Sequence, residues 1–285
     1  MSGMQVLLGK YCGFCAGVRK AVDKALAVPP QNTFILGELI HNPDVVERIR
    51  ARGIPTVERV EEVPDGATLL IRSHGVGRSV YEACERRGIR IIDCTCAFVR
   101  RSQGIVREES AKGRTIVIIG HPEHPETVGL MGWVAEGGDA YVFSSPEDDF
   151  SILREKDLSV VAQTTFSEQS FSETSENIRK VCQKTVEIFK TICYTTVWRQ
   201  REAEEIARHS DAVLVIGGRN SSNTGKLYEI ASRHCGHVIW LQNAEAFAYE
   251  EIKFFNRVGV TAGASTPDWQ TQEVLFKMEE SNAEV

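Results

Sequence analysis

Short apolar, β-branched runs recur along the chain, and each of them ends at a cluster of polar or cysteine residues. Nine such runs can be counted, and helical patterns separate them. Continuous apolar strands that alternate with helices are typical of parallel sheets covered on both faces. Such sheets bind their ligands beyond the carboxyl ends of the strands. The expected helices span residues 16–27, 43–52, 78–87, 98–112, 170–188, 199–209 and 224–235.

The ends of the nine runs fall into three sets. In the first set, "TFILGELIHN", "RTIVIIGHPEHPE" and "DAVLVIGGRNSSN" end at His41, at His124 and Glu126, and at Ser221, Ser222 and Asn223. In the second, "ATLLIRSHG", "LSVVAQTTFS" and "RVGVTAGAST" end at His74, at Thr164 and Thr165, and at Ser265 and Thr266. The third set ends in cysteine, at Cys15, Cys96 and Cys193.

The spacing within these sets predicts a repeated unit of about 90–100 residues, the lower end of the usual domain size. Cys96 and Cys193 are 97 residues apart, and His74 and Thr164 are 90 apart. We therefore expect three similar α/β domains with parallel sheets, formed by residues 14–96, by 97–193, and by 194–285 together with 1–13. An ordinary α/β protein also ends its strands in polar loops, but that alternative does not explain the recurrence of the same residue types.

Eight cysteines allow several interpretations. Disulfides are one, but a long chain without a secretory leader favours metal or redox use. Three thiolates from three units suit a soft metal or an iron–sulfur cluster, and a zinc site stays open. Cys84 and Cys182 fall in helical patterns and are expected to be packing thiols. Cys12 and Cys94 lie beside two of the candidate ligands and have no assigned role.

The histidine, hydroxyl and amide residues at the other strand ends could bind an anion. No phosphate-binding loop of the G-x-x-x-x-G-K-[ST] or G-x-G-x-x-G kind is present. Imidazoles, hydroxyls and the N–H groups of helix starts can nevertheless hold a phosphate. "NSSNTGKLYEI" is typical of a loop that opens a helix and could bind an anion there. An ordinary helix N-cap has the same residue types. Glu126, two residues after His124, is a plausible proton source.

Composition and charge narrow the function further. The chain has 285 residues, is 42 % hydrophobic and carries a net charge of −6. An acidic chain is a poor candidate for generic nucleic-acid binding, so no nucleic-acid partner is expected. No apolar run approaches the roughly 20 residues of a membrane span, and "MSGMQVLLGKYCG" lacks the basic start of a signal peptide. We expect no membrane association and a cytoplasmic location.

Successive motifs of the chain resemble those of the LytB family of iron–sulfur enzymes, the 4-hydroxy-3-methylbut-2-enyl diphosphate reductases. The motifs are "GFCAGVRKAV", "IHNPDVV", "SHGVG", "DCTCAF", "GHPEHPE", "QTTFS", "TICYTT", "RNSSNT" and "TAGASTPD", in this order from about residue 6 to residue 268. Each motif alone is weak evidence. Nine of them in order at compatible spacing are highly specific.

The resemblance implies a pseudo-threefold trefoil of the three domains around one central [4Fe–4S] cluster per chain. It implies reductive dehydroxylation of the allylic diphosphate to isopentenyl and dimethylallyl diphosphate, the last step of the non-mevalonate isoprenoid pathway. Electrons would come from a ferredoxin or a flavodoxin. The implied cluster ligands are Cys15, Cys96 and Cys193. The implied substrate-binding residues are His41, His74, His124, Thr164, Ser221, Ser222, Asn223 and Ser265, and the implied catalytic residues are Glu126, His124 and Thr164.

The chain departs from the family pattern at positions next to two cysteines. Ala97 stands where the family usually has proline, and Val197 and Trp198 stand where Thr-Asn precedes Arg-Gln. These changes predict altered redox behaviour or donor docking more than a new substrate class. Two alternatives stay open: a LytB-like reductase with a different allylic or hydroxylated substrate, and a metal or redox sensor without catalysis.

Overall fold

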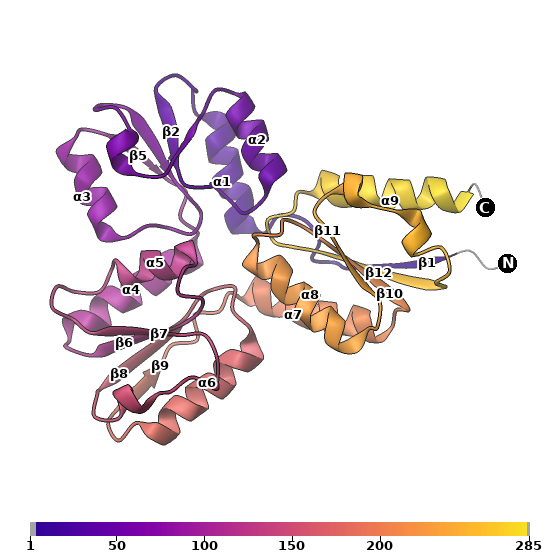
Figure 1. The fold of residues 1–285 in the computed structure, drawn as a ribbon. Helices are drawn as coiled ribbons and strands as arrows, with labels where there is room; N and C mark the ends of the chain where they lie inside the picture. The colour runs from indigo at the N-terminus through magenta and orange to yellow at the C-terminus, as the bar shows by residue number, and fades with distance from the viewer. Residues whose placement is uncertain (1–3, 284–285) are drawn as a thin grey trace. The chain divides into compact units, whose positions relative to one another are not determined.

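The computed structural model describes residues 4–283, and its framework is three separate parallel sheets of four strands each. The helices alternate with the strands along the chain (Figure 1). The predicted fold class, three α/β units with parallel sheets, is therefore confirmed. Among the described residues, no helix is both long and apolar enough to cross a bilayer.

Sheet B forms from the first third of the chain and has the strand order β3-β2-β4-β5. Its strands are β2 (Thr33–Leu36), β3 (Thr56–Val57), β4 (Thr68–Ile71) and β5 (Arg90–Asp93). The helices of this part of the chain are α1 (Ala16–Ala27), α2 (Pro43–Ala51) and α3 (Arg78–Arg86). Leu36, Leu69 and Ile71 pack with Cys84 of α3 in one apolar cluster, which fixes that helix against the sheet.

Sheet C has the order β7-β6-β8-β9. Its strands are β6 (Thr115–Ile119), β7 (Ala140–Phe143), β8 (Leu158–Ala162) and β9 (Val186–Ile188). Its helices are α4 (Ala97–Ala111), α5 (Pro125–Met131) and α6 (Glu168–Val181). Every residue of the central strands β6 and β8 is buried, as expected for parallel strands covered on both faces.

Sheet A joins the two ends of the described chain in the order β1-β12-β10-β11. Its strands are β1 (Gln5–Leu8), β10 (Ala212–Ile216), β11 (Val238–Leu241) and β12 (Arg257–Ala262), and its helices are α7 (Tyr194–Arg208), α8 (Ser222–His234) and α9 (Asp268–Ala283). Val213 and Val215 pack in the cluster with α7 and α8, whereas Leu214 and Ile216 pack with α9. Alternate side chains of β10 thus pack against helices on opposite faces of sheet A. Figure 1 shows α7 and α8 on one face and α9 on the other.

The three sheets share one topology, and the three sets of polar ends map onto it. Strands β2, β6 and β10 occupy one inner position and carry the first set. Strands β4, β8 and β12 occupy the other inner position and carry the second. The cysteine set follows the edge strands β5, β9 and β1. The opposite edge strands, β3, β7 and β11, were not expected from the sequence.

Three expected boundaries were wrong. The helix expected over 199–209 begins earlier, at Tyr194, and forms α7. The helix expected over 170–188 ends at Val181, where Cys182 adopts an extended conformation, and Val186–Ile188 forms β9 instead. The run "FKTIC" is therefore not a strand, and a segment without regular structure connects β9 to Cys193. The short edge strand β9 pairs with β8. This pairing, more than the composition of residues 186–188, makes the segment a strand.

The chain divides into two compact units. Unit 1 comprises residues 1–19, 41–45 and 194–285, and contains sheet A; unit 2 comprises residues 20–40 and 46–193, and contains sheets B and C. The strands of each sheet lie inside one of the three predicted domain ranges. The predicted domain boundaries themselves stay predictions.

Within unit 2, sheets B and C are joined by close backbone packing. Gly77 and Gly132 approach so closely that a Cβ on Gly132 would lie 2.6 Å from the Gly77 Cα. The Trp133 indole N–H donates to the Val76 carbonyl at 2.9 Å, and the Arg78 amide donates to the Gly132 carbonyl at 3.1 Å. Glycine at both positions permits this approach, because any side chain would separate the two backbones.

Candidate functional site

The three predicted cluster cysteines each stand directly before a helix. Cys15 precedes α1, Cys96 is the N-cap of α4, and Cys193 precedes α7. All three are half-buried. The positive end of a helix dipole favours the thiolate, the form of cysteine that binds metal.

One backbone hydrogen bond recurs at all three cysteines. The amide of Cys15 donates to the Ala264 carbonyl at 3.1 Å, that of Cys96 to Ser73 at 3.0 Å, and that of Cys193 to Thr164 at 3.0 Å. Each acceptor stands two residues beyond the end of an inner strand, β12, β4 or β8. The three thiols thus occupy equivalent positions. Three such thiols fit the donor set of an iron–sulfur centre.

The neighbouring thiols Cys12 and Cys94 have a different environment. The Cys12 thiol donates to the Val260 carbonyl at 3.9 Å and packs on the α9 side of sheet A. The Cys94 thiol donates to the Ile92 carbonyl at 3.7 Å. Burial raises the pKa of each thiol to about 11, so both stay protonated at neutral pH. Neither thiol stands directly before a helix, which distinguishes Cys12 and Cys94 from the three candidate ligands.

The packing interpretation extends to the other three cysteines. Cys84 is fully buried among apolar side chains of sheet B, as predicted. Cys182 and Cys235 are the C-caps of α6 and α8, and their thiols donate to backbone carbonyls at 3.4–3.7 Å. Position at a helix start distinguishes the candidate ligands from the remaining thiols.

Helix α7 holds the loop that carries Cys15. The Glu202 carboxylate accepts the amides of Lys10 at 2.7 Å and Tyr11 at 3.1 Å. The buried Arg199 guanidinium donates to the Gly13 carbonyl at 2.8 Å and to the Ala262 carbonyl at 3.0 Å. Charged groups on one helix thereby fix both ends of a loop that has little secondary structure of its own.

Gly13 turns this loop with a φ of +94°, a conformation that other residues rarely adopt. A Cβ at this position would also lie 1.8 Å from a carboxylate oxygen of Asp268. That carboxylate forms an ion pair with Arg19 at 2.9 Å. Glycine is therefore required here for two independent reasons.

In unit 1, the predicted anion-binding residues form a connected group at the start of α8. The Ser265 hydroxyl donates to the His41 carbonyl at 2.9 Å and lies 3.3 Å from the Ser221 hydroxyl. Ser221 caps the helix by accepting the amide of Thr224 at 3.3 Å. Asn223 is 4 % exposed, and neither its amide oxygen nor its amide nitrogen has a hydrogen-bond partner among residues 4–283. A buried amide of this kind is ready to bind a polar ligand.

In unit 2, four predicted site residues lie together. Nδ1 of His124 accepts the Glu126 amide at 3.1 Å, so the neutral ring carries its proton on Nε2. His74 stands edge-on to His124, with ring centroids 5.6 Å apart. The Glu126 carboxylate accepts the Thr164 amide at 2.6 Å and the Thr164 hydroxyl at 2.8 Å. Two imidazoles and a carboxyl therefore stand beside the segment that holds Cys193.

Burial raises the pKa of Glu126 to about 7, and the two hydrogen bonds from Thr164 oppose that shift without cancelling it. The side chain is only 1 % exposed, so the charged form loses nearly all its hydration. A carboxyl with a pKa near neutrality can both hold and release a proton at working pH. This is the environment that a general acid requires.

The predicted site residues thus fall into two groups. Unit 1 contains Cys15, His41, Ser221, Ser222, Asn223 and Ser265; unit 2 contains Cys96, Cys193, His74, His124, Glu126 and Thr164. No role was expected from the sequence for Arg199, Glu202 or Gln163. The side-chain oxygen of Gln163 accepts the amide of His121 at 3.0 Å. A charged residue inside a helix gives no sign of the distant loop that it binds.

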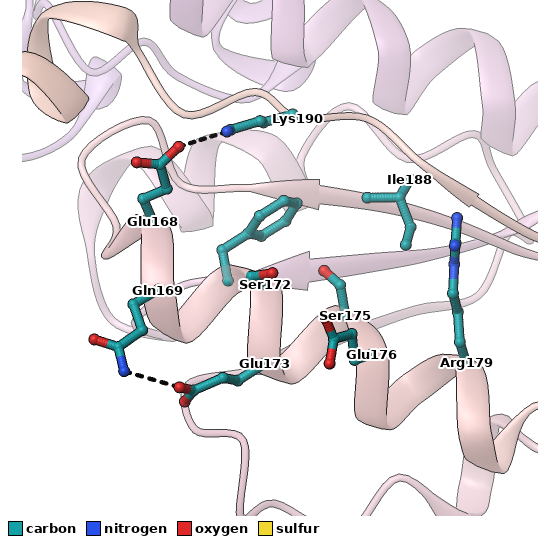
Figure 2. A pocket seen from close by; sticks show the side chains of 10 residues that line it. Glu168, Gln169, Ser172, Glu173, Ser175, Glu176, Arg179, Ile188 and Lys190 are labelled. Atoms are coloured by element: carbon teal, nitrogen blue, oxygen red, sulfur yellow. Dashed lines mark hydrogen bonds and ion pairs between the residues drawn. The ribbon is translucent and has the colours of Figure 1, made fainter.

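A separate open hollow lies between α6 and β9, with a volume of about 810 Å³ (Figure 2). Phe171 and Ile188 line it, and Glu168 and Lys190 pair at 2.6 Å across one end. None of the predicted site residues lines it.

Comparison with known proteins identifies relatives over nearly the whole chain. The family model for LytB protein matches residues 6–279. The chain is 37 % identical to the 4-hydroxy-3-methylbut-2-enyl diphosphate reductase of Thermoanaerobacter sp. strain X514, over 96 % of each chain. It is 38 % identical to the protein of the same name from Geobacter sulfurreducens, over 97 % of this chain and 98 % of that one.

Solved structures show the same similarity. A structure of (E)-4-hydroxy-3-methyl-but-2-enyl diphosphate reductase, described as the terminal enzyme of the non-mevalonate pathway, is 33 % identical, with a TM-score of 0.71 over 97 % of this chain and 99 % of that one. The corresponding reductase from Plasmodium falciparum is 24 % identical, with a TM-score of 0.87 over 96 % of this chain and 88 % of that one, and shows the shared fold.

Proposed function

Because this chain belongs to the LytB family, we propose that it reduces 4-hydroxy-3-methylbut-2-enyl diphosphate to isopentenyl and dimethylallyl diphosphate. The reaction takes up two electrons and two protons and releases the allylic hydroxyl as water. The observation that carries the proposal is the buried Glu126 carboxyl, with a pKa of about 7 and two hydrogen bonds from Thr164. A catalyst that expels hydroxide as water needs such a proton donor.

Cys15, Cys96 and Cys193 would hold one [4Fe–4S] cluster per chain. When bound, a cluster with three protein thiolates supplies single electrons and leaves one iron for a substrate oxygen. The equivalent helix-start positions of the three thiols support this assignment. Cys12 and Cys94 would not be ligands, since neither stands directly before a helix.

The diphosphate would be bound by His41, His74, His124, Ser221, Ser222, Asn223 and Ser265. The start of α8 supplies backbone N–H groups and a positive dipole end, which favour a phosphate group. The unpartnered amide of Asn223 supports a ligand at this position. His124, with its neutral-ring proton on Nε2, can donate to an anionic oxygen.

Glu126 would deliver a proton, and Thr164 would orient the substrate hydroxyl toward it. Thr164 already donates through both its amide and its hydroxyl to the two carboxyl oxygens, which fixes the orientation of Glu126. When Glu126 carries the proton, its O–H can donate to the hydroxyl oxygen of Thr164 or of the substrate. The burial of this carboxyl also excludes water that would compete for the proton.

The electron donor would be a ferredoxin or a flavodoxin, and the enzyme would act in the cytoplasm without nucleic-acid or membrane partners. The net charge of −6 supports the absence of nucleic-acid binding.

Anaerobic turnover tests the proposal directly. The protein, reconstituted with iron and sulfide, is supplied with the allylic diphosphate and dithionite-reduced methyl viologen. We expect both isoprenoid diphosphates to form, and turnover to fall at least about a hundredfold in Glu126→Gln. A cluster-loaded protein that leaves this diphosphate unchanged would refute the proposed substrate.

A further inference from the structure

Asp93 closes the shortest of the three connections between an edge strand and a candidate cluster ligand. Cys96 stands three residues after Asp93, the last residue of β5. Cys15 and Cys193 stand seven and five residues after the ends of β1 and β9. One carboxylate oxygen of Asp93 accepts the Thr95 amide at 2.8 Å, which forms an Asx-turn and bends the chain where the strand ends. This turn leads directly into Cys96, the N-cap of α4.

The second carboxylate oxygen of Asp93 joins two helices to this turn. It accepts the Tyr81 hydroxyl of α3 at 3.1 Å and a guanidinium N–H of Arg100, on α4, at 3.0 Å. Burial, and after it the charge of Asp93, raise the pKa of Tyr81 to about 12, so the phenol stays protonated and can donate at neutral pH. The Lys24 ammonium of α1 donates to the Asp93 carbonyl. Groups from three helices therefore hold Asp93 in one orientation.

Arg100 connects the Asp93 carboxylate to the first turn of the helix that Cys96 begins. The Arg100 amide donates to the Cys96 carbonyl at 2.9 Å, and the Arg100 guanidinium pairs with Asp93. The Cys96 amide in turn donates to the Ser73 carbonyl at 3.0 Å. The Asp93 side chain is only 23 % exposed, so little water competes for its charge-assisted hydrogen bonds. The backbone is thus fixed on both sides of the Cys96 thiol.

We infer that Asp93 is a positioning residue for Cys96, because it fixes the turn that presents this thiol to a metal centre. The inference rests on the proposed function, in which Cys96 holds a [4Fe–4S] cluster. Asp93 acts through the backbone of Thr95 and does not itself bind the metal. Groups that orient a metal ligand contribute strongly to metal retention. When the turn is not held, Cys96 occupies more conformations, and fewer of them can keep a bond to iron.

The segment before Cys193 is held by a different kind of contact. The hydroxyl of Thr191, two residues before Cys193, accepts the Ala162 amide and donates to the Ala162 carbonyl, both at 2.7 Å. These bonds hold the segment against the neighbouring strand β8, whereas Asp93 holds its turn from within. A change at Asp93 therefore tests the position of one cysteine and leaves the contacts of the Cys193 segment in place.

The test replaces Asp93 in two ways in the protein reconstituted with iron and sulfide. Asp93→Ala removes the carboxylate, whereas Asp93→Asn keeps an oxygen that can accept the Thr95 amide. Asp65→Ala is the matched control, because Asp65 is an exposed carboxylate in the same third of the chain and pairs with Arg87 at 2.7 Å. Iron release to a chelator is followed anaerobically, and hydrogen exchange is measured in the peptide that contains Thr95. Urea unfolding of each variant records its overall stability.

We expect Asp93→Ala to release iron about tenfold faster than the unmodified chain. Exchange at Thr95 should accelerate about fivefold or more, because its amide has lost its acceptor. Asp93→Asn should stay within about twofold of the unmodified chain in both measurements, since the Asx-turn is kept. Asp65→Ala should change neither.

Four results would each overturn the inference. They are iron release from Asp93→Ala at the unmodified rate, equally fast release from Asp93→Asn, unchanged exchange at Thr95 in Asp93→Ala, and release rates that merely follow urea stability across all variants, Asp65→Ala included. An unmodified chain that binds no iron and sulfide would instead refute the proposed cluster. Exchange at Thr95 would then still decide whether Asp93 holds the turn.

Discussion

The loop of Cys15 and the segment of Cys193 place their cysteines alike but hold them differently. Each cysteine amide donates to a carbonyl beyond an inner strand, at 3.1 Å and 3.0 Å, and each cysteine precedes a helix. The loop of Cys15 depends on hydrogen bonds between its backbone and the side chains of Arg199 and Glu202. The segment of Cys193 depends on Thr164, which in turn donates to the titratable Glu126.

The two regions therefore differ in function: one holds its cysteine in place, and the other also contains a group that can exchange a proton. Arg199 and Glu202 bind backbone groups of the loop of Cys15 directly, so this loop has a fixed frame. Glu126 changes its charge near neutrality, because burial raises its pKa to about 7. The region around Cys193 is therefore the one in which a proton can move.

The largest expected effect is on iron content, and it contrasts neighbouring thiols within one loop. Cys15→Ser should lose the cluster, because serine does not replace a thiolate ligand for soft iron–sulfur centres. Cys12→Ser should retain it, since the half-buried Cys12 thiol packs on sheet A and donates to the Val260 carbonyl. Iron and acid-labile sulfide in anaerobically purified protein measure both.

The same contrast applies in unit 2, where Cys96→Ser should lose the cluster and Cys94→Ser should keep it. Equal iron loss in Cys12→Ser and Cys15→Ser would show that Cys12 is also a cluster ligand. Position directly before a helix would then no longer distinguish ligands from packing thiols.

Glu126→Gln tests whether Glu126 titrates near neutrality, through the pH dependence of the stability of the folded chain. The folded-state pKa of about 7 lies above the ordinary 4.5, so between these values the folded chain holds a proton that the unfolded chain has lost. Stability from this group therefore falls as pH rises from about 4.5 to about 7, by roughly 3 kcal/mol. Glutamine carries no charge at any pH, so the Glu126→Gln variant should not show this fall in stability as pH rises.

Thermal unfolding at pH 5 and pH 8 checks this expectation. Glu126→Gln should raise the melting temperature more at pH 8 than at pH 5, while turnover falls. Glu123→Gln, in the same loop but exposed, serves as the control and should shift neither. A melting temperature for Glu126→Gln that differs from the unmodified chain equally at both pH values would mean that Glu126 is already ionised at pH 5.

Arg199→Ala tests how much the hydrogen bonds of Arg199 stabilise the loop of Cys15. It removes two hydrogen bonds from a buried guanidinium to the carbonyls of Gly13 and Ala262. We expect roughly 3 kcal/mol lower stability and faster iron loss, with no change in the pH dependence. Arg233→Ala, at an exposed position on α8, should stay within about 0.5 kcal/mol. Urea unfolding and iron release to a chelator measure the two effects.

The smallest effect compares two glycines with positive φ. Gly13→Ala meets the Asp268 carboxylate in addition to backbone strain and should cost about 2 kcal/mol or more. Gly66→Ala has no atom within 4 Å of the new Cβ and should cost about 1 kcal/mol from strain alone. Equal losses in urea unfolding would show that the carboxylate moves aside freely.

Much of the framework was predictable because it depends on local pattern. Strands β6, β8 and β10 are wholly buried, and their continuous apolar runs identify them. The edge strands β3, β7 and β11 have a partner on one side only, and they were missed. The end of α6 was misplaced because Cys182 and the residues after it continue an acceptable helical pattern, and only pairing with β8 turns Val186–Ile188 into a strand.

The sequence alone determined the order of the six inner strands, the polar residues at their ends and the three cysteines that recur with them. Periodicity and spacing contain that information, because strand ends follow from where apolar runs stop. Only the tertiary structure decided which thiols are buried and protonated, why Glu126 titrates near neutrality, and that Arg199 binds a loop 186 residues away. Each of these depends on desolvation or on contacts between distant segments, which no local pattern encodes.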